Sequence, residues 1–202
     1  MTNNLSDTEN KILEAAKKVF IEKGLEGSRM QEIANEASIN KALLHYYYRT
    51  KEKLFNAVFQ FAIIRFIPRI EKIFKSDKTF FEIIEAIIDQ YITLLSKNPF
   101  IPIFVLHEIN RHPDRLADII QSAGIQPKML IEKIEKEVEN GTIRPVSAIN
   151  LIVNIISLCV FPFAARPLLQ RLIFENNKQA YTAFIESRKT EVTSFIINAI
   201  KV

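Results

Sequence analysis

Apolar residues recur at intervals of three and four along nearly the whole chain, whereas the strict alternation typical of β-strands is rare. This periodicity predicts an all-α protein in which most helices bury one face. Glycine is scarce, with four residues in 202, and neither glycine-rich motif that binds nucleotide phosphates occurs in the sequence. We therefore expect a bundle of helices and no nucleotide-binding fold.

The composition indicates a folded chain in a reducing compartment. Of the 202 residues, 48% are hydrophobic and 25% are charged, which argues against global disorder and suits one or two compact units. The single cysteine, Cys159, excludes an intramolecular disulfide. Residues 1–10 are polar and lack the apolar core of a signal peptide. We therefore expect a cytoplasmic protein.

Capping residues predict three short helices followed by longer ones. Ser6 with Glu9 is typical of a helix start, and Gly24 of its end. Ser28, with Gln31 three residues later, predicts the cap of a second helix. The third and fourth helices, over 41–47 and 51–75, are expected to begin after the caps Asn40 and Thr50, and Pro68 predicts a kink or break in the fourth. The remaining helices are expected over residues 78–97, 99–111, 114–121, 127–139, 146–174 and 177–200.

The second and third helices, with only Ser38-Ile39-Asn40 between them, fit a helix-turn-helix. Small Ala34 and Ala37 would let the helices cross closely, and Leu44 would fill the angle between them. The second helix would present its first outer residues to a DNA major groove. Residues 38–53 also hold four basic residues against one acidic residue, which favours phosphate binding. Spacing alone leaves an ordinary three-helix bundle as an equal alternative.

Residues 8–60 resemble the N-terminal domain of the TetR/AcrR family of bacterial transcriptional regulators. The stretches that carry the resemblance are residues 12–16, 20–24, 33–37, 39–48 and 50–54. Residues 139–145 are similar to a turn that these regulators often place before their penultimate helix. The resemblance implies a helix-turn-helix DNA-binding domain over 1–50 and a helical effector-binding and dimerisation domain over 51–202.

The resemblance also implies roles for single residues. Ser28 and Arg29 would meet phosphate or the groove edge, Lys41 would open the recognition helix, and Lys51 would contact phosphate. The candidate DNA-binding residues are Ser28, Arg29, Asn40, Lys41, Ala42, Leu43, His45, Tyr46, Tyr47 and Lys51.

The sequence departs from the family pattern at the turn and on the recognition helix. Ser38 replaces the common turn glycine, which costs about 1 kcal/mol if the turn is left-handed. Ala42 replaces a glycine, Leu43 a threonine and His45 a tyrosine. The operator sequence therefore cannot be copied from a relative.

The titratable residues do not form a catalytic or metal-binding pattern. The chain has three histidines, of which His107 and His112 are five apart and do not share a helix face. With one distant cysteine, a zinc site is not expected. We expect no enzymatic activity and no cofactor.

The end of the helix expected over 99–111 combines an apolar run with polar groups. His107 and Arg111 are four apart and would share one face, as would Phe104 and Glu108. Such groups would orient a small-molecule effector in an apolar pocket, and the solvated end of a helix is the favoured alternative. The candidate ligand-binding residues are Tyr91, Phe104, His107, Glu108, Arg111, Met129, Asn154 and Cys159. For those on neighbouring helices, core packing is the favoured alternative.

The last two long helices have apolar faces that are broad for a single partner. The resemblance implies that they pair with their two-fold mates in a homodimer, and a monomer core is the alternative. The candidate interface residues are Ile152, Ile156, Phe184, Val192, Phe195 and Ile196. Residues 145–165 carry no formal charge and are long enough to cross a bilayer, but a polar stripe and Pro162 favour a buried helix over a membrane span.

The sequence thus predicts a homodimeric regulator of transcription, and a repressor in particular. It would bind a palindromic operator on double-stranded DNA and leave it when a small, lipophilic ligand binds. The alternative is a small-molecule-binding or interaction protein of the same fold that no longer reads a specific DNA sequence. A single-span membrane protein is a third, weaker alternative.

Overall fold

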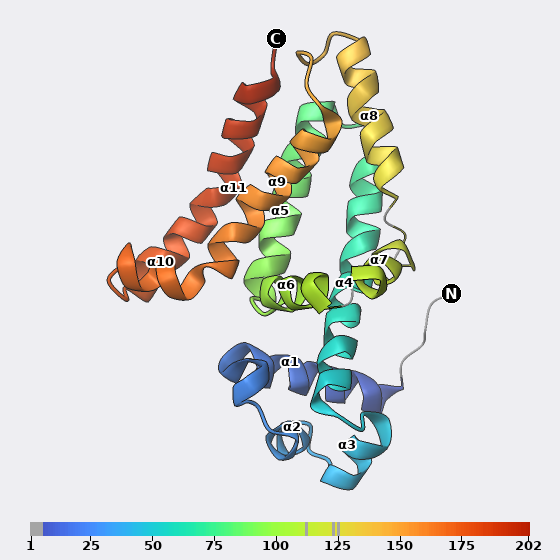
Figure 1. Cartoon of the computed structure of the whole chain (residues 1–202), viewed down its shortest axis with the longest axis vertical. Helices are drawn as coiled ribbons and strands as arrows, with labels where there is room; N and C mark the ends of the chain where they lie inside the picture. The colour runs from blue at the N-terminus through green and yellow to red at the C-terminus, as the bar shows by residue number, and fades with distance from the viewer. Residues whose placement is uncertain (1–5, 112, 123, 125) are drawn as a thin grey trace.

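The computed structural model describes residues 6–111, 113–122, 124 and 126–202, without the side chains at positions 65, 107, 108, 111, 115 and 119. Within these residues the fold is all-α, as the periodicity predicts, with eleven helices. Residues Ile143 and Lys201 form an isolated β-bridge. The first three helices lie together at one end of the molecule, and the long helix α4 leads from them into the remaining helices (Figure 1).

The three short helices begin near their expected residues. They are α1 (Asp7–Gly27), α2 (Met30–Glu36) and α3 (Lys41–Tyr47). The Ser6 side chain accepts a hydrogen bond from the backbone N–H of Glu9 at 3.2 Å, which confirms the predicted cap of α1. Gly24 has φ 68° and ψ 179°, so regular helix geometry breaks at Gly24 as expected, although one further turn follows.

Helix α4 (Lys51–Phe74) begins after the predicted cap, because the Thr50 side chain accepts from the Lys53 N–H at 3.2 Å. Of the kink or break predicted at Pro68, the break is wrong, because α4 continues through this residue as one helix. Proline cannot donate to the carbonyl four residues earlier, which belongs to Ile64. Ile64 and Pro68 are both exposed, so solvent can hydrate that carbonyl and the helix tolerates the proline.

Helices α5 to α11 complete the chain. Their bounds are Phe80–Lys97, Ile101–Arg111, Pro113–Ser122, Pro127–Glu139, Ala148–Ala164, Arg166–Leu172 and Lys178–Ile200. The single helix expected over 146–174 is wrong: α9 ends at Ala164, and α10 leaves it at an angle of 65°. Pro167 in the first turn of α10 explains the break, because it cannot donate to a carbonyl of α9.

Among the described residues no one helix has both the length and the apolar character that a membrane crossing requires, and only the bent pair α9–α10 reaches them jointly.

The core continues from the first three helices into the remainder. Helix α5 buries Ile88, Ile92 and Leu95 completely and contacts α4, α9 and α11. An aromatic cluster then joins α1, α4 and α6: the ring centroids of Phe20 and Phe55 are 4.8 Å apart, and those of Phe59 and Phe104 are 4.1 Å apart. This cluster fixes the three short helices against the helical body.

Candidate nucleic-acid interface

The turn between α2 and α3 is left-handed at a residue other than glycine. Ser38 has φ 55°, as expected if it stands in place of a turn glycine. The Ser38 N–H donates to the Asn35 carbonyl and the Ile39 N–H to the Ala34 carbonyl, each at 3.0 Å. These bonds end α2 and direct the chain sharply into α3.

The inner faces of α2 and α3 pack as the sequence predicts. Ile33, Ala34 and Leu44 are completely buried, and Ala37 is 7% exposed. Because Ala34 and Ala37 are small, the two helices approach each other closely, and Leu44 occupies the space between them. The outer side of α3 is thereby held in a fixed direction.

The outer side of α3 carries most of the candidate DNA-binding residues. Asn40 caps the helix, because its side-chain oxygen accepts from the Leu43 N–H at 2.7 Å. Tyr46 is 81% exposed, and its ring stands edge-on to the half-buried Tyr47 at 5.5 Å. The other exposed candidates on this side are Lys41, Ala42 and His45. Leu43 is half-buried, so it and Tyr47 present only part of their surface.

Ser28 does not cap α2, which corrects the sequence-based prediction. Its hydroxyl donates backwards to the carbonyls of Gly24 and Leu25, the second at 3.0 Å, and the residue is 3% exposed. The Ser28 side chain is therefore not placed to meet a phosphate. The N-cap is the exposed Arg29, whose backbone N–H donates to the Glu32 carboxylate at 3.2 Å.

Lys51 is occupied within the chain. Its Nζ donates to the Ser28 carbonyl oxygen at 3.2 Å and to the Glu26 carbonyl oxygen at 3.4 Å. The side chain is half-buried against the link between α1 and α2. Lys51 thus joins the start of α4 to the start of α2.

Two ion pairs hold α1 against α2. The Lys18 Nζ lies 2.7 Å from Glu36 Oε1, and the Lys23 Nζ lies 2.9 Å from Glu32 Oε1. The hydrogen bond from Lys23, together with the Arg29 N–H, holds the pKa of Glu32 below its usual range. Both pairs are largely exposed, so they orient the helices more than they stabilise them.

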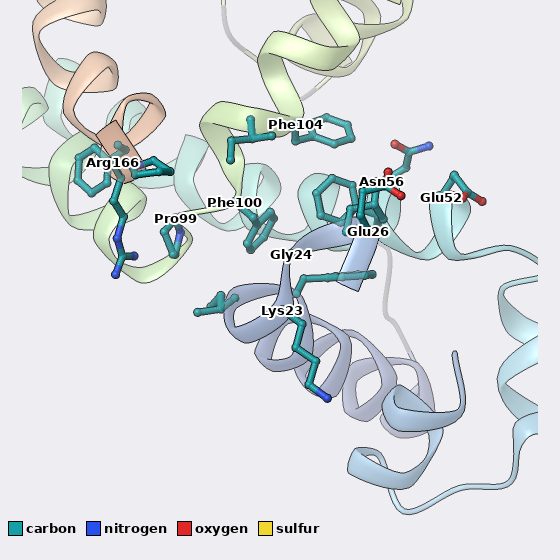
Figure 2. Close-up of a pocket in the computed structure, with 16 residues that line it drawn as sticks. Lys23, Gly24, Glu26, Glu52, Asn56, Pro99, Phe100, Phe104 and Arg166 are labelled. Carbon is teal, nitrogen blue, oxygen red and sulfur yellow. The ribbon is translucent and has the colours of Figure 1, made fainter. Parts of the chain in front are cut away.

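A groove of about 560 Å3 lies where α1, α4, α6 and α10 meet. Figure 2 shows its lining, in which Arg166 lies at one end and Glu26, Glu52 and Asn56 lie at the other. The apolar lining residues are Phe20, Ile21, Leu25, Phe55, Pro99, Phe100, Ile103, Phe104, Phe163 and Pro167. Sequence reasoning missed this groove, because its walls come from four distant segments.

The groove unites few of the candidate ligand-binding residues. Phe104 lines it, but Tyr91, Met129, Asn154 and Cys159 are not among its lining residues. Met129 is 61% exposed on α8, and Asn154 is exposed on α9. The side chains of His107, Glu108 and Arg111, and the whole of His112, lie outside the described residues.

Tyr91 and Cys159 belong instead to the interior of the helical body. Cys159 is completely buried, and this burial raises the pKa of its thiol to about 12. Burial also raises the pKa of the half-buried Tyr91. Core packing, the alternative considered from the sequence, describes both positions.

The candidate dimer residues separate into two groups. Ile156 and Phe195 are 45% and 65% exposed, and Ile152 and Phe184 are half-buried. Val192 and Ile196 are 1% and 2% exposed, so they pack within the protomer and not on a surface open to a second copy. Three further apolar residues of α9, which were not among the interface candidates, are also exposed: Ile149, Val153 and Phe161.

Comparison with known proteins gives matches of two kinds. Residues 12–58 match the family model for bacterial regulatory proteins of the tetR family. The chain is 42% identical to the HTH-type transcriptional repressor NicS of Pseudomonas putida over 53 residues. This matched stretch covers 26% of this chain and 25% of that protein. It is 28% identical to the Fatty acid metabolism regulator protein of Bacillus subtilis over 85 residues. This second stretch covers 42% of this chain and 44% of that protein. The matches thus span less than half of either curated relative.

The structural match is longer. The crystal structure of HlyIIR, a hemolysin II transcriptional regulator, is 27% identical and superposes with a TM-score of 0.62. The superposition covers 96% of this chain and 97% of that chain. The likeness therefore extends through the helices that follow residue 58.

Proposed function

Because this chain belongs to the TetR family of bacterial transcriptional regulators, we propose that it represses transcription by binding a palindromic operator as a dimer. Residues 1–50 read the DNA, and residues 51–202 pair the two copies and bind an effector. Such a protein acts on the chromosome, in the cytoplasm. The similarity of its first helices to the repressor NicS supports the direction of regulation.

The observation that carries the proposal is the outer side of α3. Its exposed Lys41, Ala42, His45 and Tyr46 lie on a short helix whose inner side is anchored by the buried Leu44. A helix held in this way enters a major groove with its first residues at the base edges. The basic residues that flank α3, including Arg49 and Lys53, are exposed and contact phosphates.

Dimerisation sets the spacing of the two α3 helices. The exposed apolar residues on α9 and α11, Ile156 and Phe195 among them, form the surface that a second copy covers. Ligand binding favours a conformer whose α3 helices no longer match the half-site spacing. The ligand shifts this equilibrium only by its difference in affinity for the two conformers.

Fluorescence anisotropy with duplexes from the gene's own upstream region tests the proposal, at fixed near-physiological salt. We expect a preference of about 10³-fold or more for one short palindrome over scrambled DNA. If that region gives no preference, selection of bound fragments from the whole genome extends the search. Equal, weak binding to every duplex would favour a ligand-binding protein that no longer reads DNA.

A further inference from the structure

We propose that the groove between α1, α4, α6 and α10 is the effector site, and that it binds an amphipathic anion with its apolar part between Ile21 and Ile103 and its charge at Arg166. This assignment rests on the proposed regulatory function and adds to it the place and the chemistry of the ligand. The groove of about 560 Å3 falls within the range of small-molecule sites.

The apolar part of the ligand is inferred from the side chains that line the groove. Ile21 on α1 and Ile103 on α6 are 40% and 58% exposed, although both line the groove. The floor between them includes Phe55 and Phe100, which are each 6% exposed. A ligand in the groove would therefore remove two large aliphatic side chains from water and rest against aromatic rings.

The negative charge of the ligand is inferred from the positively charged side chain of Arg166. Its guanidinium carbon lies 5.5 Å from the centroid of the Tyr181 ring, and among the described side chains it has no carboxylate partner. Stacking on the ring limits the freedom of the guanidinium, so a carboxylate loses little additional entropy on binding to it. Lys23, the other cation of the lining, is already paired with Glu32.

The acidic end of the groove is unsuited to an anionic group, because like charges repel. The backbone N–H of Glu52 and the Thr50 hydroxyl hold the pKa of Glu52 below its usual range, so its carboxylate is engaged at the start of α4. Glu26 is exposed to solvent. Figure 2 shows both at the end away from Arg166, so the apolar part of the ligand would point towards them.

The position of the groove explains how such a ligand would act on DNA binding. Its lining comes from α1 and α4, from residues 99–104 around the start of α6, and from residues 163–167 where α9 meets α10. Helix α1 contacts α2 through the Lys18–Glu36 and Lys23–Glu32 pairs. A ligand that displaces α1 from α6 therefore displaces α2 and α3 as well.

Isothermal titration calorimetry with decanoate, decanol and decylamine, below their micelle concentrations, tests the site without DNA. We expect decanoate to bind about tenfold more tightly than decanol, because one charge-assisted hydrogen bond supplies a difference in affinity of about that size. Arg166→Gln should remove this difference and leave decanol binding unchanged. Arg171→Gln, on the same helix but outside the groove, is the matched control. Preference for decylamine, or an unchanged preference in Arg166→Gln, overturns the charge assignment.

A second variant tests the location. Ile103→Trp places bulk in the groove from an exposed position, and we expect it to weaken both decanoate and decanol by at least about tenfold. Ile64→Trp, at an equally exposed position of α4 outside the groove, should bind as the parent does. Undiminished binding by Ile103→Trp overturns the location. So does a lower molecular mass of Ile103→Trp in light scattering, because the groove would then be covered by a second copy.

A third measurement separates the site from the regulatory function. Decanoate should release the parent protein from its selected duplex and should not release Ile103→Trp. If no duplex is bound specifically, the proposed function fails while the calorimetry still decides the groove. If decanoate binds the groove and leaves DNA binding unchanged, the groove is not the effector site.

Discussion

The ammonium of Lys51 lies 3.2 Å from the carbonyl oxygen of Ser28 and donates a hydrogen bond to it. Lys51 is the first residue of α4, and Ser28 stands two residues before α2. The bond therefore ties the helix that enters the body of the molecule to the first helix of the helix-turn-helix. The position of α2 depends on α4 and not only on its own packing.

Replacement of Lys51 by Met should destabilise the protein by about 1 kcal/mol, because two carbonyl oxygens lose a charged donor while the aliphatic stem remains. Urea unfolding followed by circular dichroism measures the change. Lys53→Met is the control, since that side chain is exposed on the same turn of α4. Equal free energies of unfolding for the two variants would mean that the Lys51 hydrogen bonds do not stabilise the fold.

Replacement of Lys41 by Ala should weaken operator binding by about tenfold and lower the slope of affinity against salt by about one, because one phosphate contact is lost. Anisotropy titrations at several salt concentrations give both values. The same change at Lys128, exposed on α8, should alter neither. An unchanged affinity in Lys41→Ala would mean that α3 is not the recognition helix.

Replacement of Ser38 by Gly should stabilise the protein by about 0.5–1 kcal/mol, because φ 55° strains a serine and not a glycine. Gly24→Ala should do the opposite, with a loss of about 1–3 kcal/mol, since φ 68° with ψ 179° is a region open essentially to glycine alone. Space does not limit Gly24, because an added Cβ would meet nothing within 4 Å. Thermal unfolding of both variants separates backbone strain from packing.

Replacement of Phe195 by Arg should dissociate the proposed dimer and leave each protomer folded, because the ring is 65% exposed in the single chain. Sedimentation equilibrium should show at least about a hundredfold weaker self-association. Met129→Arg, an equally exposed apolar position on α8, is the matched control. If Phe195→Arg remains dimeric, the two copies meet elsewhere.

The thiol of Cys159 should resist Ellman's reagent at pH 8 until the protein unfolds, because it is fully buried with its pKa raised to about 12. Its usual pKa is 9.0, so the unfolded chain releases the proton first as pH rises. The contribution of this group to stability is therefore complete below about pH 9 and is lost between pH 9 and 12. Cys159→Ala should flatten that part of the stability profile, and rapid labelling of the native protein would contradict the burial.

Local sequence signals were sufficient to predict where α3 and α4 begin. Asn40 and Thr50 cap α3 and α4 as predicted, because an N-cap acts only on the next three residues. Ser28 failed as a cap because the break at Gly24 leaves carbonyls within reach of its hydroxyl, and nothing in the Ser28–Gln31 spacing reports that geometry. The break after Ala164 had a signal in Pro167, which the long apolar run obscured.

The groove and the proposed dimer surface depend on tertiary packing, and the sequence could not separate them from the core. Val192 and Phe195 have similar apolar character on one helix, yet one is 1% and the other 65% exposed. Ile21 and Ile103 are eighty-two positions apart, and no periodicity relates them. Which apolar residues remain open is decided by how α1, α6, α9 and α11 meet.

The unbroken course of α4 through Pro68 has a mechanical consequence. Its 24 residues form a rod about 36 Å long, similar to the distance between half-sites one DNA turn apart. A tilt of about 5° at one end of such a rod displaces the other end by about 3 Å. A break at Pro68 would absorb that motion, whereas a continuous α4 would transmit it to the helices that rest on its first turn. In the proposed regulator, such a small tilt of α4 in the body of the protein would shift the helices at its first turn by about the rise of one base pair.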